Sequence, residues 1–168
     1  MNKLLREALI TQVREFHVQA MQIVQSGEQH IPILFLLTEG GKIEPIPFTE
    51  YIDDKDLAAD MLQAFRAKEG VVATIFLSEA WTVTIPKDSA AGRRLAAGKN
   101  PLRKPSESHD RKECLFYMVQ TADNDQFAVQ TEIIRGESEI TFGPLEIMTE
   151  DSEDTKMVGR FVGDPLNP

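Results

Sequence analysis

Two stretches of the chain repeat apolar side chains at the three- and four-residue spacing of an amphipathic helix. The first covers residues 3–26 and is followed by Gly27, a residue suited to the left-handed turn that ends many helices. The second covers residues 55–69 and follows Asp53 and Asp54, whose carboxylates can cap the start of a helix. The spacing therefore predicts two helices, each packed through one apolar face.

Elsewhere the pattern is typical of β-strands. Residues 31–38 and 112–121 are apolar on both faces, as in interior strands, whereas residues 126–135 alternate between apolar and polar positions. Pro45 and Pro47 lack the N–H donor that a sheet ladder needs. We therefore expect the segment around these two prolines to lie at a sheet edge.

The order of the elements predicts the fold class. The strand-like segments are residues 31–38, 42–48, 70–86, 112–121, 126–135, 140–142 and 145–148. Most are joined by short turns, which connect antiparallel neighbours. We expect an α+β domain with an antiparallel sheet of about five to six strands and two helices packed on one face. The expected order is α-β-β-α-β-β-β, with an optional short strand at the end.

Residues 1–148 are expected to form this single domain, and residues 149–168 an acidic, partly mobile tail. The net charge of -9 argues against general binding to nucleic acid or to anionic membranes, which rests on positive charge. A long loop over residues 87–111 is the exception, because its first part is strongly basic.

Three features point to the cytoplasm. The lone Cys114 excludes an internal disulfide and fits a reducing compartment. The charged N-terminal stretch is unlike a signal peptide, and the longest apolar run is too short to span a bilayer.

The strand-like segment 70–86 holds one carboxylate, Glu79, on a face that is otherwise apolar. Burial of an unpaired carboxylate on such a face is unfavourable. Either a β-bulge near residues 78–80 turns Glu79 to solvent, or the side chain stays inward and is satisfied by a partner. In the second case Glu79 is a site candidate.

Pairing of this segment with residues 112–121 would place Glu79 in a definite neighbourhood. If Ile85 lies near Lys112, antiparallel counting puts Trp81 by Phe116 and Glu79 by Met118.

The motifs of common catalytic sites are missing from the sequence. Ser108, His109 and Asp110 are neighbours in sequence, but a catalytic triad must meet through the fold. Cys114 lies in an apolar strand pattern, where an inert buried thiol is expected. The histidines show no metal-ligand spacing, and no nucleotide-binding glycine pattern occurs, so we expect neither a metal nor a cofactor.

Two short motifs carry a family resemblance. Ser78-Glu79-Ala80-Trp81, with the later Pro105-Ser106, Asp110-Arg111 and Glu113, resembles a pattern in bacterial proteins of unknown function, over residues 31–135. The resemblance implies a cytoplasmic bacterial α+β protein and supplies no activity. It also implies that Glu79, Trp81 and residues 110–113 act together, through an ion pair of Arg111.

These observations leave three functional hypotheses. The leading one is a non-catalytic, self-associating binding or interaction protein whose ligand is a protein partner or a small anion. The second is an enzyme with Glu79 as general acid or base and His109 or Arg111 orienting an anionic substrate. The third is contact with phosphate or nucleic acid through the basic loop. The candidate binding residues are Trp81, Arg93, Arg94, Arg103, Lys104, Ser106, Asp110 and Glu113.

Overall fold

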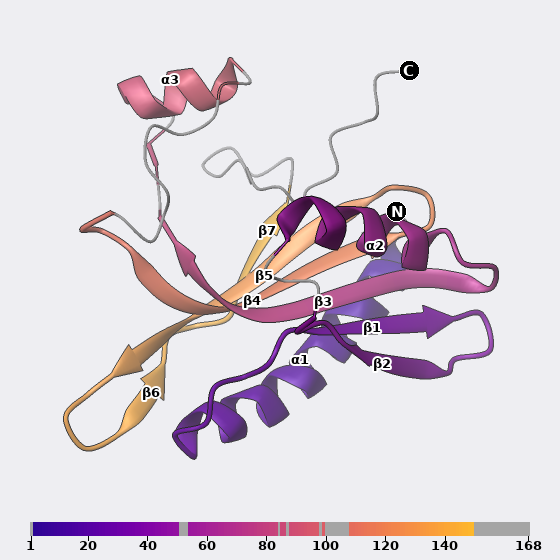
Figure 1. Ribbon diagram of the computed structural model, residues 1–168, viewed down its shortest axis with the longest axis horizontal. Helices are drawn as coiled ribbons and strands as arrows, with labels where there is room; N and C mark the ends of the chain where they lie inside the picture. Colours follow the sequence, from indigo (N-terminus) through magenta and orange to yellow (C-terminus); the bar gives the residue numbers. More distant parts are fainter. Residues whose placement is uncertain are drawn as a thin grey trace.

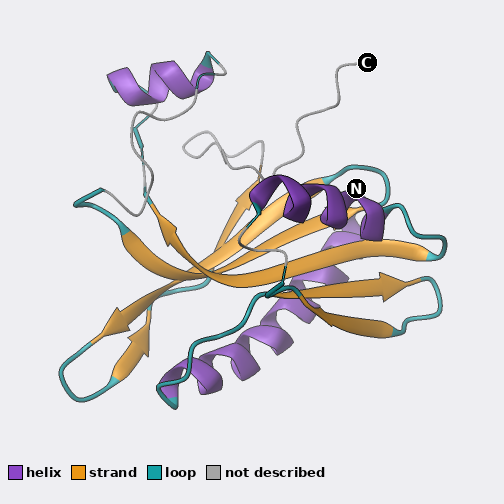
Figure 2. Cartoon of the chain, viewed as in Figure 1, coloured by secondary structure: helices purple, strands orange, loops and turns teal. Residues whose placement is uncertain are grey.

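The computed structural model describes residues 2–50, 54–83, 85–86, 88–97, 99 and 108–149. Its elements, in chain order, are α1 (Lys3–Gln25), β1 (Ile33–Thr38), β2 (Ile43–Pro47), α2 (Lys55–Arg66), β3 (Val71–Thr82), α3 (Ala90–Ala96), β4 (Lys112–Thr121), β5 (Gln126–Arg135), β6 (Ile140–Phe142) and β7 (Glu146–Thr149) (Figures 1 and 2).

The described residues form one antiparallel, strongly curled sheet of seven strands. Its hydrogen-bonded order is β2-β1-β3-β4-β5-β6, and β7 pairs with the same edge of β5 as β6 does. The predicted α+β class and the edge position of Pro45 and Pro47 are therefore confirmed. The element order departs from the prediction in two ways: a third helix, α3, lies within the loop expected over residues 87–111, and the described residues form seven strands where five to six were expected.

Capping side chains fix where the two long helices begin. The side chain of Asn2 accepts a hydrogen bond of 2.9 Å from the backbone N–H of Leu4. Asp54 does the same for α2, accepting from the N–H groups of Asp56 and Leu57 at 3.1 Å each. Both side chains satisfy donors that a helix start leaves without an internal partner.

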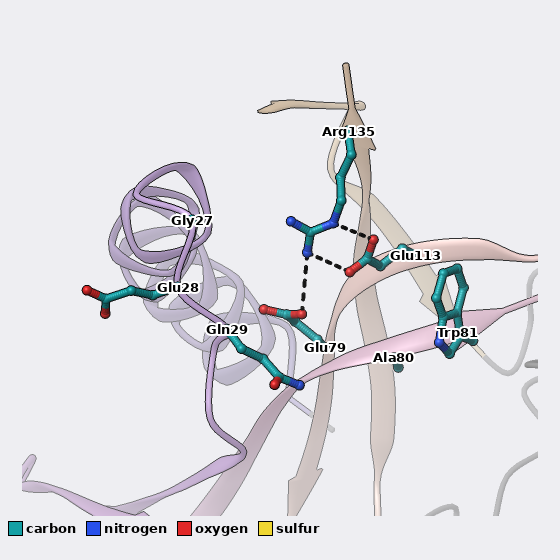
Figure 3. A pocket seen from close by; sticks show the side chains of 8 residues that line it. All are labelled: Gly27, Glu28, Gln29, Glu79, Ala80, Trp81, Glu113 and Arg135. Carbon is teal, nitrogen blue, oxygen red and sulfur yellow. Dashed lines mark hydrogen bonds and ion pairs between the residues drawn. The ribbon is translucent and has the colours of Figure 1, made fainter. Parts of the chain in front are cut away.

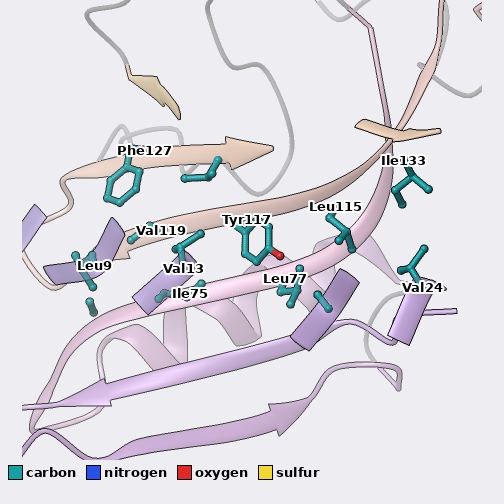
Figure 4. Close-up of a cluster of buried hydrophobic side chains, with 13 residues drawn as sticks. Leu9, Val13, Val24, Ile75, Leu77, Leu115, Tyr117, Val119, Phe127 and Ile133 are labelled. Carbon is teal, nitrogen blue, oxygen red and sulfur yellow. The ribbon is translucent and has the colours of Figure 1, made fainter. Parts of the chain in front are cut away.

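The helices differ from the prediction in one respect, because α1 and α2 lie on opposite faces of the sheet (Figure 1). Ile75 and Tyr117 belong to the core under α1, shown in Figure 4, whereas Phe76 and Met118 belong to the core under α2. Adjacent strand residues point to opposite faces, so both faces of β3 and β4 are buried. The expectation of two helices on one face was wrong in this respect.

The register of β3 and β4 also differs from the prediction. Lys112 pairs with Thr82 rather than with Ile85, so Trp81 lies opposite Glu113 and Glu79 opposite Leu115. The reason is the length of β3, which ends at Thr82 instead of continuing toward Pro86. The connecting loop therefore leaves the sheet earlier than expected.

Candidate functional site

A cleft opens where α1 ends and the sheet continues beyond it. Gly27 has a φ of +84°, a left-handed conformation that lets the chain turn away after the last helical residues. The adjoining ends of β3, β4 and β5 are left uncovered by the helix. The resulting cavity has a volume of about 390 Å³ and is lined by Gly27, Glu28, Gln29, Glu79, Ala80, Trp81, Glu113 and Arg135 (Figure 3). We call it the α1-end cleft.

The Glu79 side chain points inward and has partners, which is the second of the two alternatives drawn from the sequence. The pairing of β3 with β4 runs through Glu79 without a bulge, and its side chain is only 10% exposed. The backbone N–H of His30 donates a hydrogen bond of 2.6 Å to Glu79 Oε1. Glu79 Oε2 lies 3.7 Å from Nη2 of Arg135. The carboxylate is thus satisfied by a backbone donor and a guanidinium.

Arg135 joins the carboxylates of two neighbouring strands. Its Nε and Nη2 donate to the two oxygens of Glu113 at 2.8 and 2.7 Å, a two-pronged ion pair. The hydrogen bond to Glu113 raises the pKa of Arg135. Figure 3 shows the guanidinium between Glu113 and Glu79, with the loop of Glu28 and Gln29 across the cleft. Strands β3, β4 and β5 are therefore tied together at this end by one side chain.

Sequence reasoning named Arg111 as an ion-pair residue of this group and missed Arg135. The guanidinium carbon of Arg111 lies 4.6 Å from the centre of the Trp81 ring, within the range of a cation–π contact. Trp81 is 44% exposed at the cleft, a high value for an indole. The true register could have identified Arg135. Cys114 pairs with Glu132, so continuing the same register puts Glu113 near Ile133, and Arg135 lies on the same face two residues further along β5.

The other predicted site residues lie elsewhere or outside the described residues. His109 and Asp110 are exposed and do not line the cleft. Arg93 and Arg94 belong to α3, which stands apart from the sheet in Figure 1, and the Arg93 side chain donates to the backbone carbonyl of Asp88. Ser106, Arg103 and Lys104 fall outside the described residues, as does the tail beyond Thr149.

Three potentially reactive side chains are buried in the sheet core. His17 Nδ1 lies 3.0 Å from the hydroxyl of Tyr117, and burial lowers the pKa of His17 and raises that of Tyr117. Burial likewise raises the pKa of Cys114, which favours the unreactive thiol. Among the described residues no cluster of His, Cys, Asp or Glu has an arrangement that could hold a metal ion.

The arrangement in the cleft suits binding better than proton transfer. Both inward carboxylates already have protein partners, whereas the large aromatic side chain of Trp81 is exposed. A general base must reach a proton of its substrate, whereas an exposed aromatic side chain beside charged groups is a common anchor for a partner.

Within the part of the chain that the structure describes, no helix is both long and apolar enough to cross a membrane.

Comparison with curated proteins and with solved structures found no match. The model of a family described as bacteriophage lambda protein ea47 matches residues 1–157, and this description names a phage protein without an activity. The match does not test the two short motifs of the Glu79 and Asp110 regions. Because it covers nearly the whole chain, the chain belongs to the bacteriophage lambda ea47 family.

Proposed function

We propose that this protein is a non-catalytic interaction domain that binds a protein partner in the α1-end cleft. The observation that carries the proposal is the exposure of Trp81 at the cleft, beside the paired groups of Glu79, Glu113 and Arg135. Tryptophan and arginine are the residues that most often dominate protein–protein binding energy. Rigid charged neighbours add orientation, because polar groups across an interface must match in sign.

The contacts of Glu79 favour this function over the enzyme hypothesis. One oxygen accepts from the His30 backbone and the other faces Arg135, so a substrate would have to displace a protein contact before Glu79 could take up its proton. A small anion is also a poor ligand, because among the described residues that line the cleft three carboxylates, those of Glu28, Glu79 and Glu113, face one cationic side chain, Arg135.

The finer features of the proposal rest on the sequence. The lone Cys114 supports a reducing compartment, so we place the protein in the cytoplasm of a bacterial host. Self-association also stays a prediction, for which light scattering at several protein concentrations is the measurement. A mass that does not change with concentration and equals that of one chain would contradict it.

Capture of partners by the purified protein tests the proposed site. The wild type, Trp81→Ala and Val18→Ala serve as baits in a lysate of phage-infected bacteria. Val18 is an exposed apolar residue of α1 that does not line the cleft, so its variant is the matched control. We expect a partner that the wild type and Val18→Ala retain and that Trp81→Ala binds at least about tenfold more weakly, since central aromatic anchors contribute 2 kcal/mol or more. Equal capture by all three baits would contradict the cleft as the docking site.

A second measurement separates binding from catalysis. A thermal-shift screen of small molecules is followed by an assay for turnover of each hit, with the wild type and Glu79→Gln. Turnover that the wild type supports and Glu79→Gln abolishes would overturn the non-catalytic reading. Stabilisation without turnover would support it.

A further inference from the structure

The two edges of the sheet differ in the hydrogen-bonding groups that they expose. At the β2 edge, the N–H of Phe48 donates to the carbonyl of Pro32, and the N–H of Thr38 donates to the carbonyl of Lys42. Hydrogen-bonded pairs alternate along an antiparallel ladder. In the register of β1 and β2, the even-numbered residues of β2 therefore bond to β1, and Ile43, Pro45 and Pro47 face outward.

The outward positions of β2 hinder the addition of another strand, and we call such an edge closed. Proline has no N–H, so of the three outward residues only Ile43 offers a donor. An incoming strand would find carbonyl groups without the alternating donors that a ladder needs. Prolines are a known means of keeping an edge strand from pairing with another chain.

At the opposite edge of the sheet, strand β7 contains no proline. The N–H of Thr121 donates to the carbonyl of Asp125, so the odd-numbered residues of β5 bond to β4 and its even-numbered residues bond on the other side. In the register of β5 and β7, Glu146 and Met148 bond to β5. The N–H and C=O of Ile147 therefore point outward, and Ile147 is 37% exposed.

We infer that β7 is a second docking surface, to which an extended, basic segment of a partner protein adds as a further strand. Addition of a strand to a free edge uses the backbone for affinity and the flanking side chains for specificity. Glu146 is exposed in β7, and the chain as a whole has a net charge of -9. The incoming strand would thus meet an acidic side chain on a negatively charged protein, which favours lysine or arginine in the partner.

The same charges disfavour a second copy of this chain as the occupant. Each copy has a net charge of -9 and an exposed Glu146 in β7. Pairing of two β7 strands would bring two such negatively charged chains into contact, and like charges at a strand pair are destabilising. This inference extends the proposed function to a surface separate from the α1-end cleft, and each can fail without the other.

Amide hydrogen exchange of the full chain tests the inference residue by residue. The probe is a short peptide of alternating lysine and valine, and its counterpart has glutamate in place of lysine. We expect the lysine peptide to slow exchange at the Ile147 amide by at least about tenfold, because the amide gains a hydrogen bond, and to leave the Ile43 amide unchanged. The glutamate peptide should have no effect.

A second test compares binding of the lysine peptide by two matched proline variants. Ile147→Pro removes the outward donor of β7 while keeping the bonds to β5, and Ile43→Pro makes the equivalent change at the closed edge. We expect Ile147→Pro to abolish binding of the lysine peptide and Ile43→Pro to bind as the wild type does. An unchanged Ile147 amide, equal binding by Ile147→Pro, or equal binding of the two peptides would overturn the inference. Protection of the Ile147 amide in a dimer without peptide would overturn it too, in favour of a second copy.

Discussion

Arg135 is the side chain on which the charge balance of the cleft depends. Glu79 and Glu113 face it from β3 and β4, and both are mostly buried. Replacement by methionine would leave two buried carboxylates without their cation. We expect Arg135→Met to lower the free energy of unfolding by about 1–2 kcal/mol, as measured by urea denaturation. This is less than the 3–5 kcal/mol of a fully buried pair, because the Arg135 side chain is 44% exposed.

An exposed ion pair in the same sheet supplies the control. Lys112 and Glu132 are 2.7 Å apart, and both side chains are well exposed. Lys112→Met should therefore lower the free energy of unfolding clearly less than Arg135→Met does, because solvent screens an exposed pair. Equal losses in the two variants would mean that Arg135 is no more than a surface charge.

The buried pair of His17 and Tyr117 makes stability depend on pH. Burial lowers the pKa of His17 below its ordinary value of 6.5, so the unfolded chain binds a proton at a higher pH than the folded chain does. Stability is therefore constant with respect to His17 above about pH 7 and falls as the pH drops through 6.5. His30 shifts in the same direction, mainly through burial, and adds to the slope.

Urea denaturation between about pH 7.5 and 5.5 measures this effect, since histidine titrates in that range. His17→Gln should reduce the loss of stability on acidification. A wild-type stability that does not fall over this range would contradict the assignment.

At the level of elements, the prolines of β2 have a consequence that can be measured. Pro45→Thr together with Pro47→Thr restores two outward N–H groups and opens the edge. We expect the double variant to self-associate in a concentration-dependent way by light scattering, relative to the wild type. Pro86→Thr, the same chemical change outside the strands, is the control. Identical behaviour of the double variant and this control would show that the prolines do not protect the edge.

Element positions could be predicted from the sequence far better than the contacts between them. The bounds of β4, β5 and β6 match the predicted segments, because their turns are short and polar. The pairing of β3 with β4 could not be fixed in the same way. A long loop imposes no register, and a strand end misplaced by a few residues moves every cross-strand neighbour. Arg135 was missed for this reason.

The arrangement of the helices had a signal in the sequence that was not used. Residues 31–38 and 112–121 are apolar on both faces, which already requires a layer on each side of the sheet. In the structure, Leu34 faces α2 and Phe35 faces α1. For Glu79, the sequence narrowed the outcome to two alternatives, and only the positions of His30 and Arg135 could decide between them.

For the molecule as a whole, the two cores share the strands β1, β3 and β4 and should unfold together. Leu9 lies in the core under α1 and Leu34 in the core under α2, and both are buried. Leu9→Ala and Leu34→Ala should each lower the free energy of unfolding by about 2–5 kcal/mol. Calorimetry and far-ultraviolet circular dichroism should show one transition that both variants shift. Separate transitions for the two variants would mean that each layer folds independently.

The position of Trp81 has an optical consequence. It is the single tryptophan of the chain, and its indole lies at the α1-end cleft beside Arg111. Emission excited at the red edge of the protein absorption band therefore comes from this one place. Its wavelength and its quenching by iodide or acrylamide report on water at the cleft alone, so the unlabelled protein carries its own fluorescent sensor of whatever binds there.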